Sequence, residues 1–164
     1  MRTTLEQILA CDEFQKLKAI GGHKVYHLEG DAWTHTMLVI DEAKRMFPDE
    51  PLMWRVAALH DVGKIYTSIE QGLGDWVYPD HAMCGSFKGV LAKFISLDDE
   101  DFERIQWYIK NHIKPLFWKG DEWKRMECLD GCSVRNLARL AVCDIRGSKS
   151  VEDQSEKIAF LLSL

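Results

Sequence analysis

The sequence has little proline and no long apolar run. Four of its 164 residues are proline, and no stretch approaches the roughly 18 consecutive apolar residues of a membrane-spanning helix. The first residues, MRTTLEQILACDEF, are amphipathic and acidic and lack the apolar centre of a secretory signal peptide. We therefore expect a cytoplasmic protein without a membrane segment.

The cysteine spacing and the net charge argue against two further classes of protein, zinc knuckles and general nucleic-acid-binding proteins. None of the five cysteines forms a CxxC pair, which argues against a zinc knuckle and favours reduced thiols. The formal net charge is -5, so the chain lacks the basic face of a general nucleic-acid-binding protein. A local basic pocket for one phosphate remains compatible with this charge. We expect a small-molecule nucleotide or an RNA-end phosphate as partner, with no long nucleic acid and no membrane.

Helical periodicity dominates, and strand alternation is nearly absent. We therefore predict an all-α fold: a single domain over 1–164, a bundle of about seven helices with a metal site in its core. Its core spans 23–149, with an N-terminal helix in 1–20 and a C-terminal helix in 150–164. Thr4, Asp31 and Ser133 are the predicted caps of three helices, and Ser150 with Asp153 resembles a capping box for the last. Residues 65–79 are predicted to form a loop and 116–131 an irregular segment.

Three polar residues fall on apolar helical faces. His112 continues the stripe of Phe102, Ile105 and Ile109 at helical spacing; His35 and Asp144 lie in similar rows. A buried carboxylate is costly unless it is paired or bound to a metal. Metal ligation would satisfy these groups together, whereas each histidine alone is equally compatible with a hydrogen-bonded core position.

The dipeptide His60-Asp61 precedes Gly63, which is predicted to end its helix. Adjacent helical residues diverge by about 100°, but at a helix end both can serve one cluster. Lys64 follows at once, and Arg146 lies two residues after Asp144. Both are candidate phosphate contacts. The alternative for Lys64 is a solvated helix-terminal lysine, and the alternatives for Arg146 are a surface arginine or a salt bridge to a ligand carboxylate.

Five short sequence segments occur in the same order along the chain as the motifs of a known family. They are His27-Leu28-Glu29-Gly30-Asp31-Ala32-Trp33-Thr34-His35-Thr36, Ala58-Leu59-His60-Asp61-Val62-Gly63-Lys64, Pro79-Asp80-His81, Asn111-His112 and Asp144-Ile145-Arg146-Gly147. Together they resemble the HD-domain metal-dependent phosphohydrolases, and most closely the HD domain of bacterial CCA-adding tRNA nucleotidyltransferases. No Gly-rich motif with paired Asp precedes residue 23. We therefore expect a stand-alone equivalent of that domain that does not add CCA.

The resemblance implies a ligand set for one or two divalent ions (Mn, Fe, Ni, Zn or Mg). The first ion would be held by His35, His60, Asp61 and Asp144. His81 and His112 would bring a second ion bridged by Asp61, or would contact phosphate instead. His27 is expected beside the substrate, not as a ligand.

The predicted reaction is hydrolysis of nucleotide phosphate esters, either phosphomonoesters or cyclic 2′,3′- or 3′,5′-phosphodiesters. A bound metal lowers the pKa of water from 15.7 to about 7. Asp61, Lys64 and Arg146 are the predicted catalytic residues; Lys64, Arg146 and His27 would contact substrate. One alternative is hydrolysis of dNTPs or dinucleoside polyphosphates. Others are a metal-bearing RNA- or protein-binding module without turnover, and a structural role without metal.

The sequence leaves open the role of two sets of residues, one aromatic and one apolar. The aromatic residues in irregular stretches favour either base stacking or hydrophobic packing; they are Trp76, Tyr78, Trp118 and Trp123. The apolar residues of the last helix favour either a homo-oligomer or burial in the core; they are Ile158, Phe160, Leu161 and Leu162.

Overall fold

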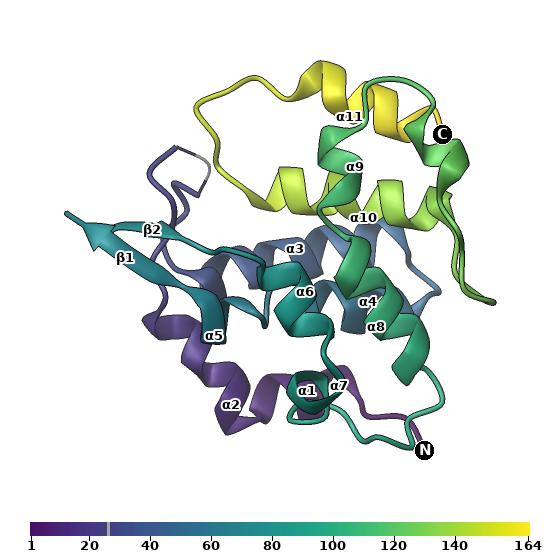
Figure 1. Cartoon of the computed structure of the whole chain (residues 1–164), viewed down its shortest axis with the longest axis horizontal. Helices are drawn as coiled ribbons and strands as arrows, with labels where there is room; N and C mark the ends of the chain where they lie inside the picture. The colour runs from purple at the N-terminus through teal and green to yellow at the C-terminus, as the bar shows by residue number, and fades with distance from the viewer. Residues whose placement is uncertain (26) are drawn as a thin grey trace.

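The protein is mainly helical, as predicted. A computed structural model describes residues 1–25 and 27–164, and in these ranges the only sheet is one two-stranded hairpin. Figure 1 shows a bundle with the two termini at opposite ends and the hairpin projecting from one side. Within the same ranges, no helix combines the length and the apolar character needed to cross a membrane.

Three helices form the centre of the bundle. They are α3 (Ala32–Met46), α4 (Pro51–Leu59) and α10 (Val134–Gly147). Helix α3 packs against both α4 and α10 (Figure 1). The predicted caps are confirmed, because Asp31 accepts a hydrogen bond from the Thr34 amide and Ser133 accepts one from Asn136.

The N-terminal segment is broken into three short helices, so the single predicted helix in 1–20 is wrong. They are α1 (Leu5–Ala10), α2 (Asp12–Gln15) and the 3-10 helix η1 (Lys16–Ala19). Cys11 between the first two is extended, with ψ of 130°. In an unbroken helix Phe14 would lie about 240° around the axis from Ile8. The break lets both side chains be fully buried.

Gly63 is not the residue that closes α4, contrary to the prediction, because α4 ends at Leu59 with His60 as its cap. Its φ is -61°, and the chain continues through a turn into α5 (Lys64–Thr67). A Cβ atom on Gly63 would lie 1.9 Å from the carbonyl oxygen of His81 at the start of α6 (His81–Ser86). The glycine is needed for the close approach of these two segments.

The predicted loop over 65–79 contains the end of α5 and the hairpin. Strands β1 (Ile69–Gly72) and β2 (Asp75–Val77) pair antiparallel, with Ile69 opposite Val77. Leu73 and Gly74 form the turn, both at positive φ. The hairpin was missed because β1 is fully exposed and lacks the alternation of a half-buried strand.

Several later boundaries also differ from prediction. The helix expected from Asp80 is interrupted at the extended Phe87, which separates α6 from α7 (Lys88–Leu91). The following elements are α8 (Phe102–Asn111), α9 (Lys114–Phe117), the 3-10 helix η2 (Glu122–Arg125) and α11 (Ser155–Leu162). The expected capping box of the last helix is wrong: Ser150 accepts from the Glu152 amide, and α11 begins only at Ser155. These interruptions divide the chain into more and shorter helices than predicted.

Candidate metal centre

Six polar side chains from five parts of the fold meet in the core. His35 comes from α3, and His60 with Asp61 from the end of α4. The other three are His81 at the start of α6, His112 at the end of α8 and Asp144 in α10. The structure thus brings together all the residues that the resemblance implies as ligands.

Three of the histidines are held in the same way. The Nδ1 atoms of His60, His81 and His112 lie 2.7, 2.9 and 2.7 Å from the carbonyl oxygens of the third residue before each, Ala57, Tyr78 and Ile109. A carbonyl oxygen only accepts hydrogen bonds, so each Nδ1 carries the proton. In a neutral ring, Nε2 then presents a lone pair.

All three Nε2 atoms are turned toward Asp61. His60 Nε2 is 3.2 Å from Oδ2, while His81 Nε2 and His112 Nε2 are 3.3 and 3.8 Å from Oδ1. His60 Nε2 is buried and has no hydrogen-bond partner among the described residues. A lone pair that faces a carboxylate is stabilised by a positive charge between them, either a proton on Nε2 or a bound metal ion. Metal-binding histidines show this arrangement, with the second ring nitrogen on a carbonyl or carboxylate.

The ligand atoms fall into two groups, in each of which they lie within 4.8 Å of one another. One group contains His35, His60 and Asp144, and the other contains Asp61, His81 and His112. His35 Nε2 is 3.1 Å from Asp144 Oδ1 and 3.6 Å from Asp61 Oδ2. Asp61 therefore directs Oδ2 at the first group and Oδ1 at the second. The donor set, imidazole with carboxylate, suits a divalent transition ion.

Burial and neighbouring charges set the protonation of the cluster. Burial, together with the nearby His60, lowers the pKa of His112 to about 3, so its ring is neutral. Burial opposes ionisation of Asp61 and Asp144, but the surrounding histidines hold the pKa of both below the usual range. Burial also lowers the pKa of His35, but the contacts with the Asp144 and Glu29 carboxylates outweigh it and raise the value to about 9. The carboxylates thus draw positive charge to the cluster.

Lys64 lies against the cluster. Its Nζ is 2.7 Å from Asp61 Oδ2 and 4.2 Å from the ring centre of Tyr78, and the side chain is buried. Lys64 therefore balances part of the Asp61 charge in this structure.

Arg146 points elsewhere. Its Nη1 lies 3.9 Å from Glu42 Oε2 on α3, and the side chain is 41% exposed. Residues two apart on a helix diverge by about 200°, so Arg146 does not share the face of Asp144. The structure brings Lys64 to the cluster and leaves Arg146 on the surface, which was one of its alternatives, in an ion pair with Glu42.

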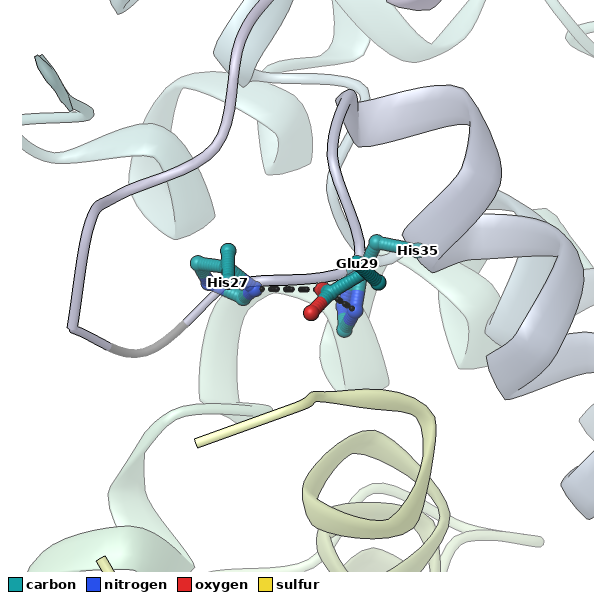
Figure 2. A group of neighbouring side chains, drawn as sticks. All are labelled: His27, Glu29 and His35. Carbon is teal, nitrogen blue, oxygen red and sulfur yellow. Dashed lines mark hydrogen bonds and ion pairs between the residues drawn. The ribbon is translucent and has the colours of Figure 1, made fainter. Parts of the chain in front are cut away.

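Sequence reasoning missed Glu29 as a site residue. Figure 2 shows its carboxylate between two histidine rings. Oε1 lies 2.9 Å from Nδ1 of both His27 and His35; the second contact is an ion pair outside the angles of a hydrogen bond. Oε2 accepts a hydrogen bond from the Lys149 amide at 2.8 Å. A glutamate in a loop has no periodicity to single it out, and its place two residues after His27 was the only signal.

His27 lies beside the cluster, and its ring centre is 4.7 Å from that of His35. Burial lowers the pKa of His27, and the hydrogen bond with Glu29 offsets part of this effect. The ring is partly exposed and borders a cleft that Asp144 also lines.

Comparisons with known proteins give one similarity. A stretch of 69 residues, 42% of this chain, is 36% identical to a Multifunctional CCA protein of Alkalilimnicola ehrlichii. The chain spans only 15% of the length of that relative. No family model matches the sequence, and no solved structure matches it. The similarity supports a relationship with part of that relative and reaches no further.

Proposed function

We propose that this chain is a metal-dependent hydrolase of nucleotide phosphate esters, acting on phosphomonoesters or on cyclic phosphodiesters. The observation that carries the proposal is the fixed orientation of His60, His81 and His112, whose Nε2 atoms all face Asp61. A buried set of oriented imidazoles and carboxylates fits a divalent ion better than a set of unrelated core contacts. The similarity to a Multifunctional CCA protein supports a phosphate ester of a nucleotide as substrate.

The proposed roles follow from the geometry. When bound, a divalent ion supplies an activated water at neutral pH and positive charge for phosphate oxygens. His35, His60, Asp61 and Asp144 would hold one ion, and His81 and His112 would complete a second site with Asp61. Lys64 holds Asp61 in place from the side of Tyr78 and adds positive charge next to the phosphate position.

Arg146 would reach a phosphate only by leaving Glu42, so we assign it no role in the unliganded site. His27, at the rim of the cluster, is the better placed of the two for a substrate contact.

The test combines metal analysis with a substrate screen. The purified protein is stripped with a chelator and reloaded with Mn²⁺, Ni²⁺, Fe²⁺, Zn²⁺ or Mg²⁺. It is then assayed on nucleoside monophosphates, on 2′,3′- and 3′,5′-cyclic nucleotides, and on dNTPs and dinucleoside polyphosphates. We expect metal-dependent release of phosphate or ring opening, and a loss of at least a hundredfold in rate for Asp61→Asn together with loss of bound metal.

Asp121→Asn is the matched control, because Asp121 is a largely exposed carboxylate in a different part of the chain. It should keep both metal and activity. Bound metal without turnover on any of these substrates would favour the metal-bearing binding module. Absence of both metal and turnover would contradict the proposal as a whole.

A further inference from the structure

A cleft opens beside the candidate metal centre. Its volume is about 540 Å³, within the 300–1,000 Å³ range typical of small-molecule sites. Asp144 and His27 line its inner end, next to the His35 and His60 rings. The walls come from α9, the end of α10, α11 and the segment that joins the last two; Figure 1 shows these elements side by side.

One wall of the cleft is apolar. It is formed by Leu116, Phe117 and Ile145. Phe117 is 73% exposed, whereas the next residue, Trp118, is only 5% exposed and packs into the core. Burial of Trp118 fixes the end of α9 and leaves the Phe117 ring on the outside, at the cleft. The Lys157 ammonium group donates to the Trp118 carbonyl and holds α11 against this wall.

The rest of the lining is polar or charged. Besides Asp144 and His27, it consists of Ser148, Ser150, Glu152, Gln154 and Lys157. Ser148 Oγ donates to the Asp144 carbonyl at 2.9 Å, and Ser150 Oγ accepts from the Glu152 amide at 3.1 Å, so this segment is held near the metal centre. Gln154 makes only a long contact of 3.5 Å with Glu152, which leaves its amide able to bond to a ligand.

The combination of apolar and polar lining residues favours one class of ligand. A flat ring with a polar edge fits between an exposed aromatic side chain and an amide with hydroxyl groups, and base–aromatic stacking is a common mode of nucleotide binding. An alkyl chain would leave the polar wall without partners, and a sugar alone would leave the apolar wall uncovered. A phosphate attached to the ring portion would reach Asp144 and His27 at the inner end.

We propose that this cleft binds the base and sugar of a nucleoside phosphate, with Phe117 stacking on the base and Gln154 bonding to its edge. The assignment rests on the proposed function only in placing the phosphate at the metal centre.

Binding to the metal-loaded protein tests this assignment. The probes are phosphonate analogues of adenosine 2′-, 3′- and 5′-monophosphate, which resist hydrolysis, and inorganic phosphate. For the analogue that binds best, Phe117→Ala should raise the Kd about tenfold, and Phe117→Tyr should restore it to within twofold. The Kd of inorganic phosphate should stay within twofold in both variants.

Phe87→Ala is the matched control, because Phe87 is also exposed but lies between α6 and α7, outside the cleft. It should leave both affinities unchanged. If the unchanged protein and Phe117→Ala bind the analogue with equal affinity and both still hydrolyse phosphate esters, the cleft assignment is overturned, whereas the proposed function is not. Failure of all three analogues to bind would also overturn the cleft assignment. Binding that depends on Phe117 without any hydrolysis would contradict the proposed function and support the cleft.

Discussion

At the scale of single residues, the candidate centre depends on how the histidines are held. His60 and His112 are the cap residues at the C-terminal ends of α4 and α8. Each ring donates its Nδ1 proton to a carbonyl of the last helical turn, that of Ala57 or of Ile109. This bond fixes the ring and directs Nε2 into the cluster.

Glu29 provides a test at this scale. Its side chain is only 1% exposed, and it contacts the Nδ1 atom of His35, whose Nε2 faces Asp144. We expect Glu29→Gln to weaken metal binding about 10- to 100-fold at the group of His35, His60 and Asp144, because loss of a carboxylate behind a metal-binding histidine reduces its basicity and its orientation. The glutamine keeps an oxygen for the Lys149 amide, so the loop contact is preserved.

Titration of the chelator-treated variant with Co²⁺, followed by absorption spectroscopy, measures this affinity. Glu152→Gln replaces an exposed glutamate and should bind Co²⁺ as the unchanged protein does. An affinity for Glu29→Gln equal to that of Glu152→Gln would show that Glu29 does not support the centre.

At the scale of secondary structure elements, the distance between α5 and α6 decides whether the group of Asp61, His81 and His112 can form. The Gly63 backbone lies against His81 and Gly85, so the two segments touch without intervening side chains. This contact brings the His81 ring to within 3.3 Å of Asp61 Oδ1. A larger residue at 63 would separate them.

We expect Gly63→Ala to destabilise the protein by about 1–3 kcal/mol or more, because its Cβ would overlap the His81 carbonyl. It should also weaken metal binding at the group of Asp61, His81 and His112. Gly89→Ala is the matched control: a Cβ there meets no atom within 4 Å, and the change should leave the free energy of unfolding the same or raise it by up to about 1 kcal/mol. Urea unfolding of both variants gives the comparison; equal stabilities would rule out the tight contact.

At the scale of the whole molecule, a buried ion-pair network joins distant parts of the chain. Arg55 of α4 pairs with Asp99, Nη1 to Oδ2 at 2.9 Å, and also with Asp101 at the start of α8. The same guanidinium donates to the Thr3 carbonyl, and the Thr3 amide donates to Asp99 at 2.6 Å. The network thus holds the N-terminal segment, α4 and α8 together on the side away from the hairpin (Figure 1).

We expect Arg55→Leu to lower the free energy of unfolding by about 3–5 kcal/mol, because it would leave the buried Asp99 carboxylate without its cation and would remove the buried one of the three cations that contact Asp101. The side chain of Arg55 is only 4% exposed, so solvent cannot replace it. Arg45→Leu removes an exposed partner of Glu42 and should change stability by less than about 0.5 kcal/mol. Thermal and urea unfolding measure both; a small effect of Arg55→Leu would mean that the network contributes little.

Much of the fold followed from local signals that a linear sequence carries. The caps at Thr4, Asp31 and Ser133 and the proline at the start of α4 identify helix starts because a side chain or ring satisfies the first turn locally. The breaks at Cys11 and Phe87 could not be predicted, because burial against other elements decides where these helices bend. The hairpin was missed because its first strand, β1, is exposed and lacks a hydrophobic face.

The sequence by itself determined the all-helical class and the presence of histidine and aspartate on inward faces, since both depend on periodicity. Only the tertiary structure decided which of them meet, because side chains from α3, α4, α6, α8 and α10 are distant along the chain and converge through packing. It also separated Lys64, which lies on Asp61, from Arg146, which pairs with Glu42. Glu29 and the cleft beside Asp144 became visible for the same reason: Glu29 lies in a loop and the cleft lies between helices and the segment that joins them, and no periodic pattern specifies how these parts sit together.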